Sequence, residues 1–188
     1  MTKRFALAAL IAPALLASGA ARAQIAPGFK VPESMAEAVD DAQSWACFLA
    51  TAGNPVPGVN QPLLGMEGEG LKIEPAAPDW LTSARPAVPG VRYSTLETPD
   101  GPIWIVFDGA RHSCLIVARS ADTAALHQAV VTRLDGDKDW KPNKAGTSDG
   151  VRSWFKRIDG SPLRWETRIW ETADPQPVLL IETLATGR

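Results

Sequence analysis

Residues 91–118, with the sequence VRYSTLETPDGPIWIVFDGARHSCLIVA, contain the pattern that points most directly to an architecture. Three runs in this stretch are rich in the β-branched and aromatic residues that favour strands: Val91–Thr98, Ile103–Phe107 and Ser113–Ala118. Residues typical of tight turns separate the runs, Pro99-Asp100-Gly101 first and Asp108-Gly109 second. The stretch therefore predicts a three-stranded antiparallel meander.

Three more strands are predicted near the end of the sequence: Val151–Ile158, Leu163–Trp170 and Val178–Leu184. In the middle one, Leu163, Trp165, Thr167 and Ile169 alternate with Arg164, Glu166, Arg168 and Trp170. Successive side chains of a strand point to opposite faces, so this alternation is typical of a strand that is buried on one side.

Two helices are predicted, one before each set of strands. The first begins at Ser34, where Ser34-Met35-Ala36-Glu37 forms a capping-box pattern. An apolar stripe at steps of three and four residues follows it, and Gly53 and Pro55 end it: Met35, Ala38, Val39, Ala42, Trp45, Ala46 and Leu49. The second helix begins at Ser120 or Asp122 and ends at Asp135-Gly136.

These elements predict a single α+β domain over residues 24–188, with antiparallel sheet(s) in a helix-βββ-helix-βββ order and the helices packed on one face. Whether the two strand sets form one sheet stays open. Residues 53–90 are rich in Pro and Gly, and we interpret them as an irregular arm or binding loop with one short strand candidate, Leu71-Lys72-Ile73. DGPIW at 100–104 resembles DGSPLRW at 159–165, an identity too short to establish a duplication.

The first 23 residues have the features of a secretory signal peptide. Lys3 and Arg4 precede an apolar run from Phe5 to Leu16, and Ala21-Arg22-Ala23 places small residues at the positions that a signal peptidase reads. We expect cleavage after Ala23, a periplasmic or secreted protein, and no transmembrane segment after cleavage. No Arg-Arg pair precedes the apolar run, which favours export as an unfolded chain.

Export determines how the two cysteines are interpreted. Cys47 and Cys114 are the only pair in the sequence, and we expect them to form a disulfide, the alternative being two buried thiols. The bond would connect the first helix to the third predicted strand. Neither cysteine belongs to a C-x-x-C motif, so a thioredoxin-like redox enzyme is not indicated.

Composition and charge exclude several classes of protein. Hydrophobic residues make up 45% and charged residues 21%, an ordinary globular mixture that excludes a disordered chain. Loss of the three basic residues before the expected cleavage point would change the net charge from −2 to −5. This acidity argues against a nucleic-acid partner, because phosphate neutralisation needs a basic surface.

Motifs that would support catalysis lack their context. Gly146-Thr147-Ser148-Asp149-Gly150 matches G-x-S-x-G, but no helix is predicted after Ser148 and no histidine follows it. Asp108 and His112 flank a predicted turn and could pair, although a turn aspartate that caps backbone amides is the simpler interpretation. Asp135, Asp137 and Asp139 lack the glycine and the acid of a calcium loop. We therefore assign no catalytic residue, no metal and no cofactor.

A basic, tryptophan-containing region is the strongest binding candidate. Residues 138–168 hold eight Lys or Arg against four acids. Alternation puts Arg152, Trp154 and Lys156 on one face of their strand, and Arg164, Arg168 and Trp170 on one face of the next. If both sets shared a sheet face, the six residues would form a cationic and aromatic surface for an anionic envelope ligand or an envelope protein.

The sequence thus favours an exported binding or accessory protein of the cell envelope rather than an enzyme. Two alternatives stay open. One is a hydrolase with a site near Asp108 and His112 or near Ser148. The other is an inhibitor-like module that contacts its partner through residues 53–90.

Overall fold

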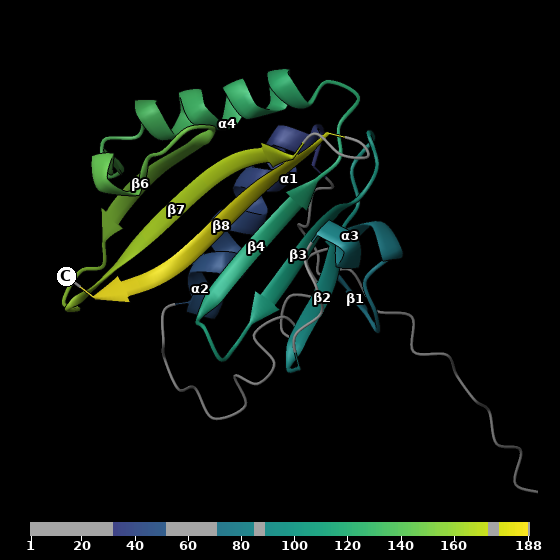
Figure 1. Ribbon diagram of the computed structural model, residues 1–188, viewed down its shortest axis with the longest axis horizontal. Coiled ribbons are helices and arrows are strands. Elements are labelled where there is room, and N and C mark those ends of the chain that lie inside the picture. The colour runs from purple at the N-terminus through teal and green to yellow at the C-terminus, as the bar shows by residue number, and fades with distance from the viewer. Residues whose placement is uncertain (1–31, 52–70, 85–88, 173–176, 188) are drawn as a thin grey trace, which may run out of the picture.

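Eight strands form one antiparallel sheet (Figure 1). The computed structural model describes residues 32–51, 71–84, 89–172 and 177–187. The strands are β1 Leu71–Glu74, β2 Val91–Leu96, β3 Ile103–Asp108, β4 Ser113–Ala118, β5 Lys141–Pro142, β6 Val151–Arg157, β7 Leu163–Thr172 and β8 Val178–Gly187. Their order in space is β1-β2-β3-β4-β8-β7-β6-β5, so the last strand of each set meets at the centre and the two sets share one sheet.

The mixed α+β class is confirmed, but the helix-βββ-helix-βββ order is not found. The first set gains β1 and a short helix, α3 Asp79–Ala84, before β2. The second set gains β5 and a 3₁₀ turn, η3 Lys144–Gly146, before β6. Strands of four and two residues are too short to show a clear period of two, and both lie in segments rich in Pro and Gly.

The first helical segment begins where the capping pattern predicts. It consists of α1 Met35–Asp41, a π-helix η1 Ala42–Cys47 and α2 Phe48–Thr51. The amide of Glu37 donates to Ser34 Oγ at 3.2 Å, while the Glu37 carboxylate accepts from the amide of Glu33 at 2.6 Å. A capping box would use the amide of Ser34, so the return bond lies one residue earlier than predicted.

The second long helix, α4 Thr123–Gly136, starts after Asp122, one of the two expected positions. The Asp122 carboxylate accepts from the amide of Ala125 at 2.9 Å and caps the helix. Figure 1 shows α1, α2 and α4 on the same side of the sheet. Their buried side chains share one core with Ile105, Ile116 and Ile181 from the sheet.

The opposite side of the sheet, which we call the open face, carries α3. Leu81 of α3 is buried against Val106, Leu115 and Val117, three residues of β3 and β4 that point away from α1 and α4. The expectation that all helices pack on one face is therefore wrong for α3. This helix lies within residues 53–90, where the proline pattern predicted an irregular arm.

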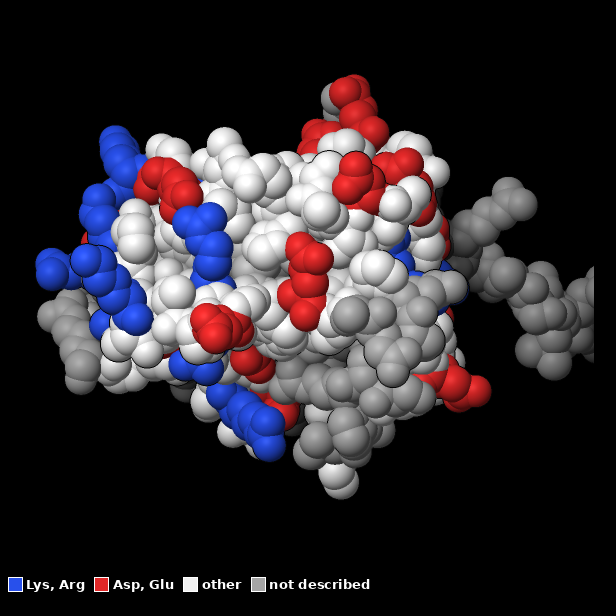
Figure 2. All heavy atoms as spheres, turned by 45° about the horizontal axis from the view of Figure 1, so that its top comes forward, with Lys and Arg blue, Asp and Glu red and all other residues white. Residues whose placement is uncertain are grey.

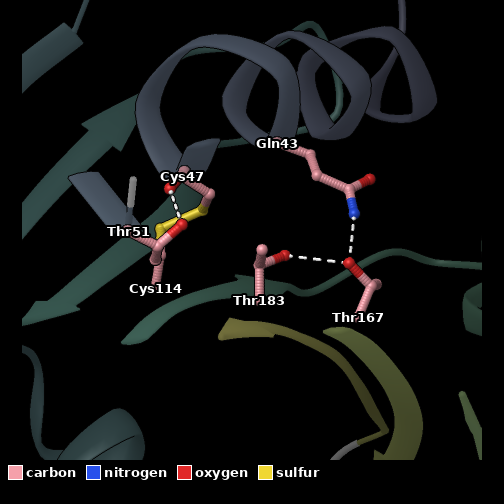
Figure 3. Close-up of a disulfide and its surroundings, with 6 residues drawn as sticks. All are labelled: Gln43, Cys47, Thr51, Cys114, Thr167 and Thr183. Atoms are coloured by element: carbon pink, nitrogen blue, oxygen red, sulfur yellow. Dashed lines mark hydrogen bonds between the residues drawn. A yellow bond between two sulfur atoms is a disulfide. The ribbon is translucent and has the colours of Figure 1, made fainter. Parts of the chain in front are cut away.

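The expected disulfide between Cys47 and Cys114 is present, with Cα atoms 5.2 Å apart. It joins the end of η1 to β4 (Figure 3). Gln43, Cys47 and Thr51 follow one another at steps of four residues, and all three are 0% exposed. The wide π turn thus places this second row of side chains against the sheet, beside the predicted apolar stripe. The side chains of Trp45 and Leu49, two members of that stripe, lie outside the described structure.

Polar side chains cross the interior between the helices and the sheet. The Gln43 side-chain amide donates to Thr167 Oγ1 at 2.9 Å, and Thr167 Oγ1 lies 3.1 Å from Thr183 Oγ1 (Figure 3). The side-chain oxygen of Gln43 accepts a hydrogen bond from the guanidinium of Arg133 in α4. The same guanidinium forms an ion pair with Asp40. Burial lowers the pKa of Arg133, and the nearby carboxylate of Asp40 opposes this shift.

Within the described residues, no helix is long and apolar enough to cross a membrane. The expected signal peptide, cleavage site and most of the arm lie outside the described residues. Of the arm, the structure describes β1 and α3 together with the short segments that adjoin them. The candidate strand at residues 71–73 is confirmed as β1.

Candidate anion-binding site

The register of β6 on β7 separates the six predicted binding residues. Arg152 lies opposite Ile169, Trp154 opposite Thr167, and Lys156 opposite Trp165. Cross-strand partners point to the same face, so this set lies on the side covered by α4. Arg164, Arg168 and Trp170 lie on the open face. The six residues therefore do not form one sheet face.

The set beneath α4 is part of the structure that holds the helix. Trp154 is 1% exposed, and its indole N–H donates to Asp135 Oδ1 at 2.9 Å near the end of α4. Arg152 lies over the Trp154 ring, 4.9 Å from its centroid, and pairs with Asp135 Oδ2 at 3.0 Å. Burial of the Trp154 ring removes it from contact with any ligand.

The three residues on the open face contact side chains of their own and neighbouring strands. Arg168 Nε donates at 2.8 Å to Oε1 of Glu166, which is 4% exposed and also accepts from Ser153 Oγ at 3.3 Å. Arg164 lies 5.1 Å from the centroid of the Phe155 ring on β6, and Trp170 packs against the apolar cluster that includes Leu180. Part of each cation remains exposed at this end of the sheet.

A pocket of about 390 Å³ lies at the edge of the sheet beside β5 and β6. The loop after α4, the edge strand β5, the end of β6 and the following turn form its walls: Lys138, Asp139, Lys141, Phe155, Lys156, Arg157 and Asp159. Figure 2 shows Lys and Arg side chains gathered toward the end of the molecule that carries β6 and the C-terminal end of β8. We call the pocket lined by these seven residues the edge pocket.

The charges of the edge pocket are only partly compensated. Lys156 Nζ lies 3.2 Å from Asp139 Oδ2, and Lys141 Nζ donates to the carbonyl oxygen of Lys138 at 2.6 Å. The exposed side chains of Lys138 and Arg157 have no ion pair among the described residues. Two cations are therefore available to a ligand beside an aromatic ring.

Of the six predicted residues, the edge pocket contains only Lys156. The basic composition of residues 138–168 already indicated the region. What was missed is the edge strand β5, which brings Lys141 directly opposite Phe155. The sequence could have indicated Phe155, because it lies between Trp154 and Lys156 in the basic region and alternation puts it on the same strand face as Arg157.

The candidate catalytic residues are not assembled. Asp108 is 4% exposed, and its Oδ1 accepts from the amides of Ala110 and Arg111 at 3.1 and 3.2 Å, which is the turn-capping role. His112 is exposed with φ 49°, and within the described structure its side chain makes no hydrogen bond to Asp108. Ser148 lies exposed in the tight turn that precedes β6. In the part of the chain that the structure describes, Asp108, His112 and Ser148 therefore do not form a nucleophile and base arrangement.

Searches against protein-family models, curated proteins and solved structures find no match to this chain.

Proposed function

We propose that the protein is an exported binding or accessory protein of the cell envelope, and that its edge pocket holds an anionic group of a ligand or partner. The observation that carries the proposal is the pair of uncompensated cations, Lys138 and Arg157, in a pocket that also contains Lys141 and Lys156. The signal-like first 23 residues and the disulfide between Cys47 and Cys114 support the compartment.

An anion is favoured over a cation or a neutral ligand for an electrostatic reason. Four basic side chains face two carboxylates around one pocket, so a bound anion would reduce repulsion that is present in the free protein. The arginine offers a planar fork of donors and the lysines offer compact charges, and both are common ligands of oxyanions.

Intact-mass measurement on protein recovered from its native cells tests the compartment. We expect a chain that begins at Gln24 and in which Cys47 and Cys114 resist alkylation until a reductant is added. A chain that begins at Met1, or one with two free thiols, would contradict export.

Titration with small anions tests the pocket. At low ionic strength, succinate or inorganic phosphate should cause saturable shifts in the amide resonances of residues that line the edge pocket. The double variant Lys138→Gln/Arg157→Gln should lose this response. Lys144→Gln is the matched control, because it removes an exposed charge from nearby η3 without changing the pocket wall. If neither succinate nor phosphate causes saturable shifts, the proposal of an anion site is contradicted.

A further inference from the structure

The geometry points to a phosphate ester as the ligand of the edge pocket, with its phosphoryl group among the basic side chains and its carbon part against Phe155. This inference rests on the proposed anion-binding function and names the chemical class of the anion. It uses two independent features of the pocket, its charge and its one aromatic wall.

The charge of the pocket matches a dianion better than a monoanion. Lys156 is compensated by Asp139 at 3.2 Å, which leaves Lys138, Lys141 and Arg157 against the single carboxylate of Asp159. The excess is two positive charges. A phosphomonoester carries a charge of roughly −1.5 to −2 at neutral pH and presents three acceptor oxygens, whereas one carboxylate carries a single charge and two oxygens.

The donors around the pocket suit several oxygens at once. Arg157 carries a fork of N–H groups at the end of β6, while Lys138 and Lys141 belong to the loop after α4 and to β5. A tetrahedral phosphoryl group can accept from donors on separate elements, because its oxygens point in different directions. A planar carboxylate directs its acceptors into one plane.

Phe155 indicates that the ligand has a carbon part as well. Arg164 lies 5.1 Å from the ring centroid, so a guanidinium of the protein already covers part of the ring, while another part lines the pocket. The volume of about 390 Å³ lies at the low end of the range for small-ligand pockets, about 300–1,000 Å³. An inorganic ion alone would leave the apolar wall without a partner, whereas a small ester would contact it.

Two sources could supply this chemistry, a soluble phosphomonoester or a lipid whose headgroup is a phosphomonoester, as in phosphatidic acid. Calorimetry with glycerol 1-phosphate, inorganic phosphate and succinate tests the soluble source. Sedimentation with vesicles of phosphatidylcholine that contain phosphatidic acid tests the lipid source. Vesicles with oleate at equal surface charge are the control, because they present carboxylates in place of the additional phosphate groups.

We expect glycerol 1-phosphate to bind at least tenfold more tightly than succinate and a few-fold more tightly than inorganic phosphate. Lys138→Gln/Arg157→Gln should weaken glycerol 1-phosphate at least tenfold, and Lys144→Gln less than twofold. Phe155→Leu should remove the preference for the ester over inorganic phosphate while phosphate itself binds as before. Thermal unfolding of each variant establishes that it is folded.

The outcomes separate this inference from the proposed function. Equal affinity for succinate and glycerol 1-phosphate would overturn the phosphate class and leave anion binding in place. No binding of any anion or vesicle would overturn both. Sedimentation with phosphatidic acid vesicles but not with oleate vesicles supports the phosphoryl site and assigns its source to a lipid. Binding of the protein to both vesicle types to the same extent overturns the phosphate class.

Discussion

Gly146 has the least room for a side chain among the described glycines. A Cβ atom at this position would lie 2.7 Å from Ser153 Oγ, 2.8 Å from Asn143 Nδ2 and 2.9 Å from Glu166 Oε1. These polar atoms belong to a cluster in which Ser153 and Glu166 are almost fully buried. The first glycine of the G-x-S-x-G pattern therefore serves the close approach of η3 to the open face rather than a nucleophile.

Replacement of this glycine should destabilise the protein. We expect Gly146→Ala to lower the free energy of unfolding by about 1–3 kcal/mol, because the cluster must shift to admit a methyl group. Urea denaturation measures the change. Gly136→Ala is the control, since a Cβ there meets nothing within 4 Å, and it should be neutral or slightly stabilising. Equal effects of the two substitutions would contradict the packing account.

Among the residues that the structure describes, Gln43 alone connects the buried hydroxyl of Thr167 with Arg133. Gln43→Ala should lower the free energy of unfolding by about 2–4 kcal/mol, because each partner loses one hydrogen bond and a cavity opens beside the sheet. Gln128→Ala is the matched control. Gln128 is exposed, and its one side-chain hydrogen bond to a described residue stays within α4, to Thr132 Oγ1 at 3.1 Å. Its loss should therefore lower the free energy of unfolding by less than about 0.5 kcal/mol.

At the scale of the element, the edge strand β1 carries an ion pair whose contribution to stability depends on pH. Lys72 Nζ lies 2.7 Å from Glu74 Oε1, and Thr95 Oγ1 of β2 donates to the same oxygen at 3.0 Å. The hydrogen bond from Lys72, with a smaller part from Thr95, holds the pKa of Glu74 below its usual value near 4.5. The pair therefore adds stability above that value and loses it as the pH falls through the lowered pKa.

Lys72→Gln should raise the pKa of Glu74 toward its usual value, although not fully, because Thr95 still donates. The difference in unfolding free energy between the two proteins should be present at pH 7 and shrink as the pH falls through the lowered pKa, because protonation of the carboxylate removes the ion pair. An NMR titration of the Glu74 carboxyl carbon measures the pKa. An unchanged value in the variant would show that Lys72 is not its cause.

The sequence predicted the central elements more accurately than the edges of the sheet. Ser113–Ala118 was predicted with the bounds of β4, because a dense apolar run lies between clear turn residues. Helix α3 was missed since Pro75, Pro78, Pro86 and Pro89 surround it. The π-helix η1 has no comparable signal, and the burial of Gln43 follows from it.

The site was harder to predict than the fold for a geometrical reason. Alternation within β6 and β7 correctly separated the faces of each strand, but it does not tell which face of β6 continues which face of β7. That relation depends on the register through the turn at Asp159-Gly160, and a shift by one residue reverses it. The edge pocket also combines side chains from a loop, β5 and β6, which no single run of sequence contains.

At the scale of the whole molecule, the disulfide is the one covalent connection between the helical layer and the sheet among the described residues. It closes a loop between positions 67 residues apart. In the chain-entropy model such a bond stabilises the protein by about 4 kcal/mol. Cys47→Ala/Cys114→Ala should lose roughly that amount in urea denaturation, and the variant should be insensitive to a reductant. A loss below about 1 kcal/mol would contradict the model.

If the protein is exported as proposed, the central position of β8 bears on how the chain folds. Val178–Gly187 follows all other described strands in sequence, yet it lies between β4 and β7 and joins the two halves of the sheet. During passage through a membrane channel from the N-terminus onward, β1 to β7 would emerge without the strand that unites them. The sulfur atoms of Cys47 and Cys114 would both emerge before it, so oxidation can precede completion of the sheet. Because the strand that joins the two halves of the sheet would cross last, the chain would stay open enough to pass through the channel until translocation ends.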